Sequence, residues 1–145
     1  MGQDLEILRS IKGGQELVDW LGYREYPYGI LHDGEIIELC LHRLEGSRLV
    51  IQGLKYEDAT LNSRIVTFYL KDVMNVNLEG FLNQNVVGSV LISPAEVREL
   101  HGSLLGIGAR NPDHQIAIEP CAGAFGLIRA TIIEIELGSV SSLKA

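Results

Sequence analysis

Residues Gly34–Leu44 read "GEIIELCLHRL", and at this stretch the hydrophobic pattern of the chain changes its period. Apolar and polar side chains alternate along it: Ile37, Leu39 and Leu41 against Glu38, Cys40 and His42. Alternation every second residue places like side chains on one face, which is typical of a half-buried β-strand. The stretch therefore predicts that a β-sheet begins here.

The same alternation continues toward the C-terminus. The further strand-like stretches are 48–56, 64–73, 74–80, 86–93, 114–120 and 127–137. The turn Glu45-Gly46-Ser47 separates the first two strands and predicts a hairpin. Residues 86–93 form a more continuous apolar run, as expected of a central strand. Successive strands joined by short turns favour an antiparallel arrangement.

Residues 1–22 follow a helical period instead. Their apolar side chains recur on one side of a helix before and after the Gly13-Gly14 pair: Leu5, Leu8 and Ile11, then Leu17, Val18 and Leu21. Gly22 is the expected C-cap. This region is therefore predicted to be a short helical segment with a break.

A second helix is expected after the central strand. Ser93 is a suitable N-cap, Pro94 suits the first helical position, and Glu96 completes a capping box. The helix would then end near His101, before Gly102.

These patterns predict a mainly β protein of the α+β class. We expect an antiparallel curved sheet, sandwich or partly closed barrel of about seven strands, with the N-terminal helical region and the one short later helix. The 145 residues fit a single domain. Within it, 1–22 form the helical segment, 34–137 the β-rich core, and 139–145 a tail that frays.

Composition narrows the class of partner and the compartment. The 19 acidic and 12 basic residues give a formal charge of −7, and no run of Lys or Arg suggests nucleic-acid binding. The apolar runs are far shorter than the ~20 residues of a membrane-spanning helix, and the N-terminus lacks the pattern of a signal peptide. We therefore expect a cytoplasmic protein without a membrane or nucleic-acid partner.

The only metal-site candidate is the trio Glu38, Cys40 and His42. Side chains spaced two apart project from one face of a strand, where they could share an ion. A half-exposed strand face commonly carries such residues and nothing else fixes their spacing, so we favour the structural interpretation. No catalytic residue and no cofactor is expected, because the chain lacks a nucleophile elbow and a complete phosphate-loop motif.

Three amides, Asn83, Gln84 and Asn85, lie between two strand-like stretches. Asparagine tolerates positive φ and bonds to nearby backbone, so a turn or bulge is the favoured explanation. The alternative places Gln84 and Asn85 partly buried, bonded to the backbone of an adjacent strand. Both interpretations make the amides structural rather than catalytic.

Three stretches together resemble a known family. They are "LHDGEIIELCLHR" (31–43), "VNLEGFLNQNVV" (76–87) and "IEPCAGAFGLIRATIIEIE" (118–136). They are similar to the bacterial polymorphic-toxin immunity proteins, specifically immunity family fifty. The chain departs from the family pattern at Leu82, where a polar residue is frequent, and the N-terminal segment and residues 93–112 have no counterpart. The resemblance implies a small cytoplasmic α+β protein that binds and neutralises a toxin domain, with no catalytic residues to transfer.

We therefore expect a non-enzymatic protein that binds a protein partner, possibly a basic toxin domain. Its acidic residues would steer the partner and its tyrosines would anchor it. The candidate binding residues are Tyr23, Tyr26, Tyr28, Glu35, Glu57 and Asp58, with Glu38 also contributing charge. Two alternatives stay open: a small-ligand-binding or metal-dependent β-barrel enzyme, and a homodimer whose sheet edges pair.

Overall fold

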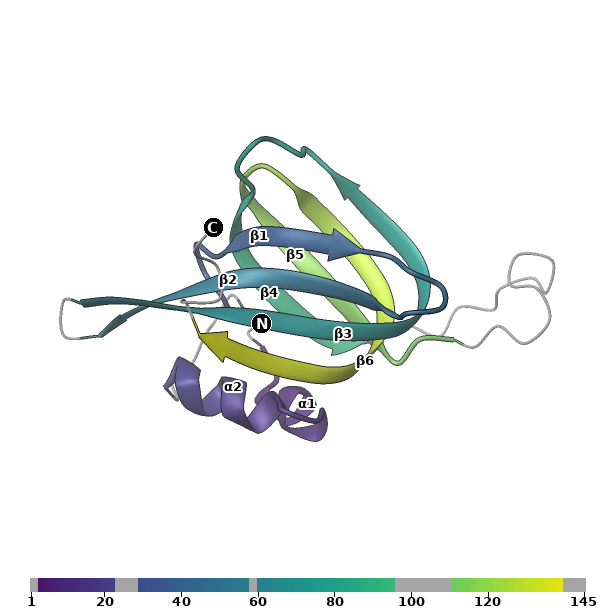
Figure 1. Ribbon diagram of the computed structural model, residues 1–145, viewed down its shortest axis with the longest axis horizontal. Helices are drawn as coiled ribbons and strands as arrows, with labels where there is room; N and C mark the ends of the chain where they lie inside the picture. The colour runs from purple at the N-terminus through teal and green to yellow at the C-terminus, as the bar shows by residue number, and fades with distance from the viewer. Residues whose placement is uncertain (1–2, 23–28, 58–59, 96–110, 140–145) are drawn as a thin grey trace.

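Figure 1 shows a computed structural model in which two short helices lie beside a sheet that curls round on itself. The structure describes residues 3–22, 29–57, 60–95 and 111–139, with the backbone alone at 56, 57, 60 and 61. The elements are α1 (Leu5–Ser10), α2 (Gly14–Leu21), β1 (Glu35–Cys40), β2 (Ser47–Glu57), β3 (Thr60–Glu79), β4 (Val86–Pro94), β5 (His114–Ala122) and β6 (Phe125–Ser139).

The strands are antiparallel and form one closed sheet in the order β1-β2-β3-β6-β5-β4. This confirms the predicted mainly β class and the predicted hairpin between β1 and β2. Among the described residues there are six strands rather than about seven, because 64–73 and 74–79 are both parts of β3. Residues 72–74, at the junction of these two stretches, form a bulge where the prediction had placed a strand end.

The bulge in β3 lies opposite a single residue of β6. The flanking backbone pairs are Lys71 with Thr131 and Asn75 with Arg129. Residues 72–74 therefore face Ala130 alone, and Asp72 adopts a left-handed conformation with φ of 51°. Extra residues on one strand bend it and increase its twist.

The partner strand β6 carries its own irregularity at the same place. Tyr69 pairs with Glu134, but Leu70 pairs with Ile132, so Ile133 is an extra residue in β6. Both strands bend here: in Figure 1, β3 runs across the lower part of the sheet and then turns upward, and β6 turns with it. Bulges that let strands pass from one sheet direction to another form the corners of orthogonally packed sheets.

The bent sheet encloses one apolar core. Fully buried side chains from β2, β3, β4, β5 and β6 form it, including Leu49, Ile51, Val66, Phe68, Leu70, Ile92, Ile116 and Ile128. Burying branched aliphatic side chains inside the sheet removes them from water and is the main stabilising term of the fold.

The sheet closes between β1 and β4 through an irregular seam. β1 and β4 pair directly at Glu35 and Val86. Further hydrogen bonds along this edge of β4 join Val87 to Asp33 and Gly34, Val90 to Ile30, and Ile92 to the Gln3 side chain. Because these bonds occupy backbone groups that a bare edge would leave open, they protect β4 from pairing with another chain.

The predicted N-terminal helical segment forms two helices, of which α2 packs on β6 and α1 packs against α2 and β4. Gly13 has φ of 82°, and a Cβ there would lie 1.8 Å from the carbonyl oxygen of Ile135, so a side chain would prevent this close approach. The Ile135 N–H donates to the Lys12 carbonyl at 2.8 Å. Leu8 and Leu17 are fully buried, and Gly22 caps α2 with φ of 67°.

Two local predictions were wrong. Pro94 is the last residue of β4 and pairs with His114, a position that tolerates the missing N–H of proline, so it does not begin a helix. The rest of that expected helix, 96–101, lies outside the described residues. In β1, a register shift between Ile36 and Glu38 disturbs the alternation and leaves Ile37 exposed instead of inward-facing.

The expected frayed tail, 139–145, lies only partly within the described residues. Ser139 belongs to β6, and the remainder of the expected frayed tail lies outside the described residues. Within the described ranges, no helix combines the length and the apolar character needed to cross a membrane.

The bend in β6 is stabilised by side chains that replace lost strand pairing. The Ile132 N–H donates to Nδ1 of His114 at 3.0 Å, and the Asp113 N–H donates to the Thr131 hydroxyl at 2.9 Å. Burial lowers the pKa of His114 below its ordinary value of 6.5, against a smaller opposing effect of the Asp113 charge. The neutral ring, which can accept at Nδ1, is therefore the form that the fold requires.

This predicts a pH-dependent stability. Because the folded-state pKa of His114 lies below its unfolded value, the unfolded chain binds more protons, and stability rises with pH. The contribution of His114 should be complete above its ordinary pKa and should be lost as the pH falls through the folded-state pKa. His114→Asn keeps an acceptor without titrating, so its urea midpoint should fall less between about pH 7 and about pH 5 than that of the unmodified protein. Equal losses in the two proteins would contradict the assigned role.

Candidate functional site

A groove lies where the β1–β2 turn faces the bulge of β3. Its volume is about 520 Å³, and it is lined by Leu41, His42, Arg43, Gly46, Ser47, Leu70, Lys71, Asp72 and Val73. We call it the hairpin groove. A second hollow of about 200 Å³ shares Gly46, Ser47 and Leu70 with it and extends to Glu45, Arg48, Tyr69, Ile133 and Glu134. The corner of the sheet thus places residues from the β1–β2 turn, β2, β3 and β6 around one hollowed surface.

Side chains hold the turn that forms one wall of the hairpin groove. Nδ1 of His42 accepts the N–H groups of Leu44 at 3.2 Å and Glu45 at 2.8 Å. The Ser47 hydroxyl accepts the His42 N–H at 3.1 Å. Polar side chains that bond to backbone groups in this way stabilise turns. Since Nδ1 is an acceptor, the proton of the neutral imidazole lies on Nε2.

The opposite wall is the β3 bulge. Leu70 is buried below it, whereas Lys71 and Asp72 are exposed. The left-handed backbone of Asp72 is unusual for a residue with a side chain, although aspartate tolerates it better than most. Backbone strain of this kind is often retained at functional positions.

Among the described residues, the two cations that line the hairpin groove, Arg43 and Lys71, lack the ion pairs that Arg48 and Lys12 form. No ion pair joins Arg43 or Lys71 to another residue in the described ranges. By contrast, Arg48 pairs with Glu38, and Lys12 lies 3.8 Å from Glu134. The groove therefore presents positive charge that the described residues leave without a close counterion.

A paired polar network covers the outer sheet face beside the groove. Cys40, Arg48, Tyr69 and Glu134 lie directly opposite one another on four adjacent strands. The hydrogen bond with Glu38, followed by its charge, raises the pKa of Arg48. The Tyr69 hydroxyl donates to Glu136 at 3.3 Å, and the pKa of Tyr69 is raised by burial first and by Glu136 second.

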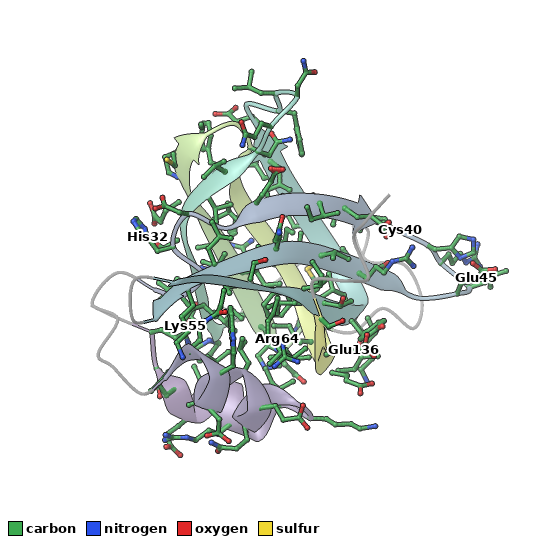
Figure 2. The ribbon with its side chains drawn as sticks, turned by 60° about the vertical axis from the view of Figure 1, so that its left-hand side comes forward. His32, Cys40, Glu45, Lys55, Arg64 and Glu136 are labelled. Atoms are coloured by element: carbon green, nitrogen blue, oxygen red, sulfur yellow. The ribbon has the colours of Figure 1, made fainter. Side chains whose placement is uncertain are left out.

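The trio considered for a metal does not share one strand face. β1 ends at Cys40, so His42 lies in the turn beyond it, and Glu38 is engaged with Arg48. Figure 2 shows Cys40 at the end of β1 and Glu45 farther out in the same turn. Among the described residues, no three His, Cys, Asp or Glu side chains gather in a way that could hold a metal ion.

Most of the predicted protein-binding residues lie outside the part of the chain that the structure describes. Tyr23, Tyr26, Tyr28 and Asp58 are not described, and only the backbone of Glu57 is. Glu35 is described and half-buried, and it pairs with Gln52 and Val86 at the seam, away from the hairpin groove.

Asn85 makes a turn and also ties two loops together. Its Oδ1 accepts the N–H groups of Leu82 at 2.9 Å and Ala124 at 3.0 Å, and its Nδ2 donates to the Leu82 carbonyl at 2.9 Å. Its backbone carbonyl accepts the Ile36 N–H at 2.8 Å. Asn83 and Gln84 are exposed. The three stretches that carry the family resemblance thus meet through Asn85.

The residues that shape this end of the molecule were not predicted from the sequence. Lys71, Asp72 and Leu44 carry no local signal, because their neighbours in space come from distant parts of the chain. Ile133 did leave a signal: Ile132 and Ile133 are consecutive in an otherwise alternating strand, which is the mark of a one-residue bulge.

Comparison with protein-family models, curated proteins and solved structures finds no significant match to this chain.

The network predicts a shift in the titration of Tyr69. Glu136→Gln should lower the pKa of the phenol toward its ordinary value without restoring it fully, because burial remains the larger cause. Titration of the protein with tyrosine labelled at the ring carbon that bears the hydroxyl would measure this. Glu6→Gln on α1 is the matched control and should leave Tyr69 unchanged. An unaltered Tyr69 titration in Glu136→Gln would refute the contact.

Proposed function

We propose that the protein is a non-enzymatic binding protein and that another protein docks on its hairpin end. The observation that carries this proposal is the exposure of three large aliphatic side chains at this end of the molecule. Leu41, 52% exposed, and Ile133, 47% exposed, line the two hollows, and Leu44, 86% exposed, lies in the turn between Arg43 and Glu45. Together these three residues form what we call the hairpin-end surface.

Apolar side chains grouped around a hollow and bordered by charges are the usual anatomy of a protein interface. Contact with a partner would remove Leu41, Leu44 and Ile133 from water, while Arg43 and Glu45 on the rim stay solvated. The bulged strands and the bonded turn hold these side chains in place before binding, which reduces the entropy lost on association.

The polar groups nearby support binding over catalysis. Glu38 pairs with Arg48, and Tyr69 bonds to Glu136, so these charged and polar groups stabilise the sheet face. A general base or nucleophile would instead need to face a substrate-sized space within hydrogen-bond reach of its target.

We further propose that the partner is a toxin domain and that the protein acts in the cytoplasm as an immunity-type protein. The resemblance of residues 31–43, 76–87 and 118–136 supports this. In this chain those stretches meet through the hydrogen bonds of Asn85, and they also supply Leu41 and Ile133 of the hairpin-end surface. The formal charge of −7 would speed encounter with a basic partner.

The proposal predicts a complex with the toxin domain encoded beside the gene. Calorimetric titration should give saturable binding, and Leu44→Gln combined with Ile133→Gln should weaken it by at least about tenfold, because both apolar contacts are lost. Phe81→Gln with Leu82→Gln is the matched control, since this exposed apolar pair lies on the β3–β4 loop instead. It should bind as tightly as the unmodified protein.

Three outcomes decide between the candidates. Failure to bind the toxin domain, or failure to protect cells from it, would reject the immunity-type function. Equal weakening by both pairs of substitutions would place the interface elsewhere. A dimer in light scattering that Leu44→Gln dissociates would show that a second copy of the chain occupies the hairpin-end surface.

A further inference from the structure

We propose that the hairpin groove binds the oxyanion group of a ligand, a phosphate or a carboxylate. This inference goes beyond docking of a protein partner and does not depend on it, because it concerns the groove between the turn and the β3 bulge and its own donors.

The side chains that line the hairpin groove carry more positive than negative charge. The chain carries 19 acidic and 12 basic residues, yet the side chains lining the hairpin groove include Arg43 and Lys71 against the single carboxylate of Asp72. Neither cation forms an ion pair with another described residue. A guanidinium and an ammonium that are left unpaired beside one hollow are suited to an anionic group.

Two further donors come from the turn itself. The hydrogen bonds at Nδ1 of His42 leave Nε2–H as the donor of the neutral ring. Ser47 uses its hydroxyl oxygen to accept the His42 N–H, so its own O–H is not consumed by that bond. The same contacts that build the turn therefore fix two neutral donors in the wall of the hairpin groove.

The remaining lining can receive the body of a ligand. Leu41, Leu70 and Val73 contribute apolar surface, and the volume of about 520 Å³ lies within the usual range of roughly 300–1,000 Å³ for small-molecule sites. The groove thus combines an apolar floor with a small number of converging polar groups, which is how such sites orient a ligand.

The carboxylate of Asp72 supplies a further test of the charge in the hairpin groove. This carboxylate is the only negative charge among the residues lining the groove, and it should oppose an oxyanion. Because asparagine also tolerates positive φ, Asp72→Asn removes the charge while keeping the backbone conformation at φ of 51°. The substitution should therefore tighten binding.

The experiment is a titration of the full chain with inorganic phosphate and, separately, with citrate, followed by amide resonances at constant ionic strength. We expect saturable shifts at residues 41–47 and 70–73. Arg43→Gln combined with Lys71→Gln should weaken binding by at least about tenfold, and Asp72→Asn should strengthen it severalfold. Arg9→Gln on α1 is the matched control and should leave the affinity unchanged.

The probes separate the possible ligand sources. Shifts with phosphate alone indicate a phosphorylated ligand, shifts with citrate alone indicate a carboxylate, and shifts with both support the shared chemistry. The proposal is overturned if neither probe gives saturable shifts, if chloride gives the same shifts, or if the double variant binds as well as the unmodified protein. The amide spectra also show whether each variant is folded. If the unmodified protein binds phosphate or citrate but does not bind the toxin domain, only the proposed partner is rejected.

Discussion

The pairing of β3 with β6 is the constraint on which the rest of the structure depends. These are the two longest strands, and both turn a corner at the same point, where residues 72–74 face Ala130 and Ile133 is inserted in β6. A bend in one strand alone would break the ladder between them, so the two irregularities must coincide. His114 and Thr131 supply the hydrogen bonds that secure this corner, and Leu70 and Ile132 fill the core beneath it.

The corner also creates the surface on which both functional proposals rest. The bulge takes Asp72 out of the regular ladder beside Lys71, and the β1–β2 turn lies across from both residues. The extra residue in β6 is Ile133, and its side chain is exposed. Irregular backbone that bends a sheet therefore also re-aims side chains toward a partner or ligand.

Much of the fold could be predicted from the sequence because alternation and helical spacing are local signals. Leu8 and Leu17 mark the helices, and Val66 and Phe68 mark an inward strand face. The bulge in β3 escaped because it adds two residues, which preserves the period of two and resembles a boundary between strands. The hairpin groove escaped as well, since it joins residues about thirty positions apart whose contact depends on the corner. Asn85 was recognised as a polar turn residue, but its bond to Ala124 depends on tertiary structure.

The register across the corner is the most direct test of this architecture. Inter-strand proton contacts measured by NMR should place Lys71 opposite Thr131 and Asn75 opposite Arg129, with Ala130 facing the bulge. An unbulged ladder would instead place Asn75 opposite Leu127. Observing the Asn75–Leu127 pair would contradict the coincident bend of β3 and β6 and, with it, the placement of the hairpin groove.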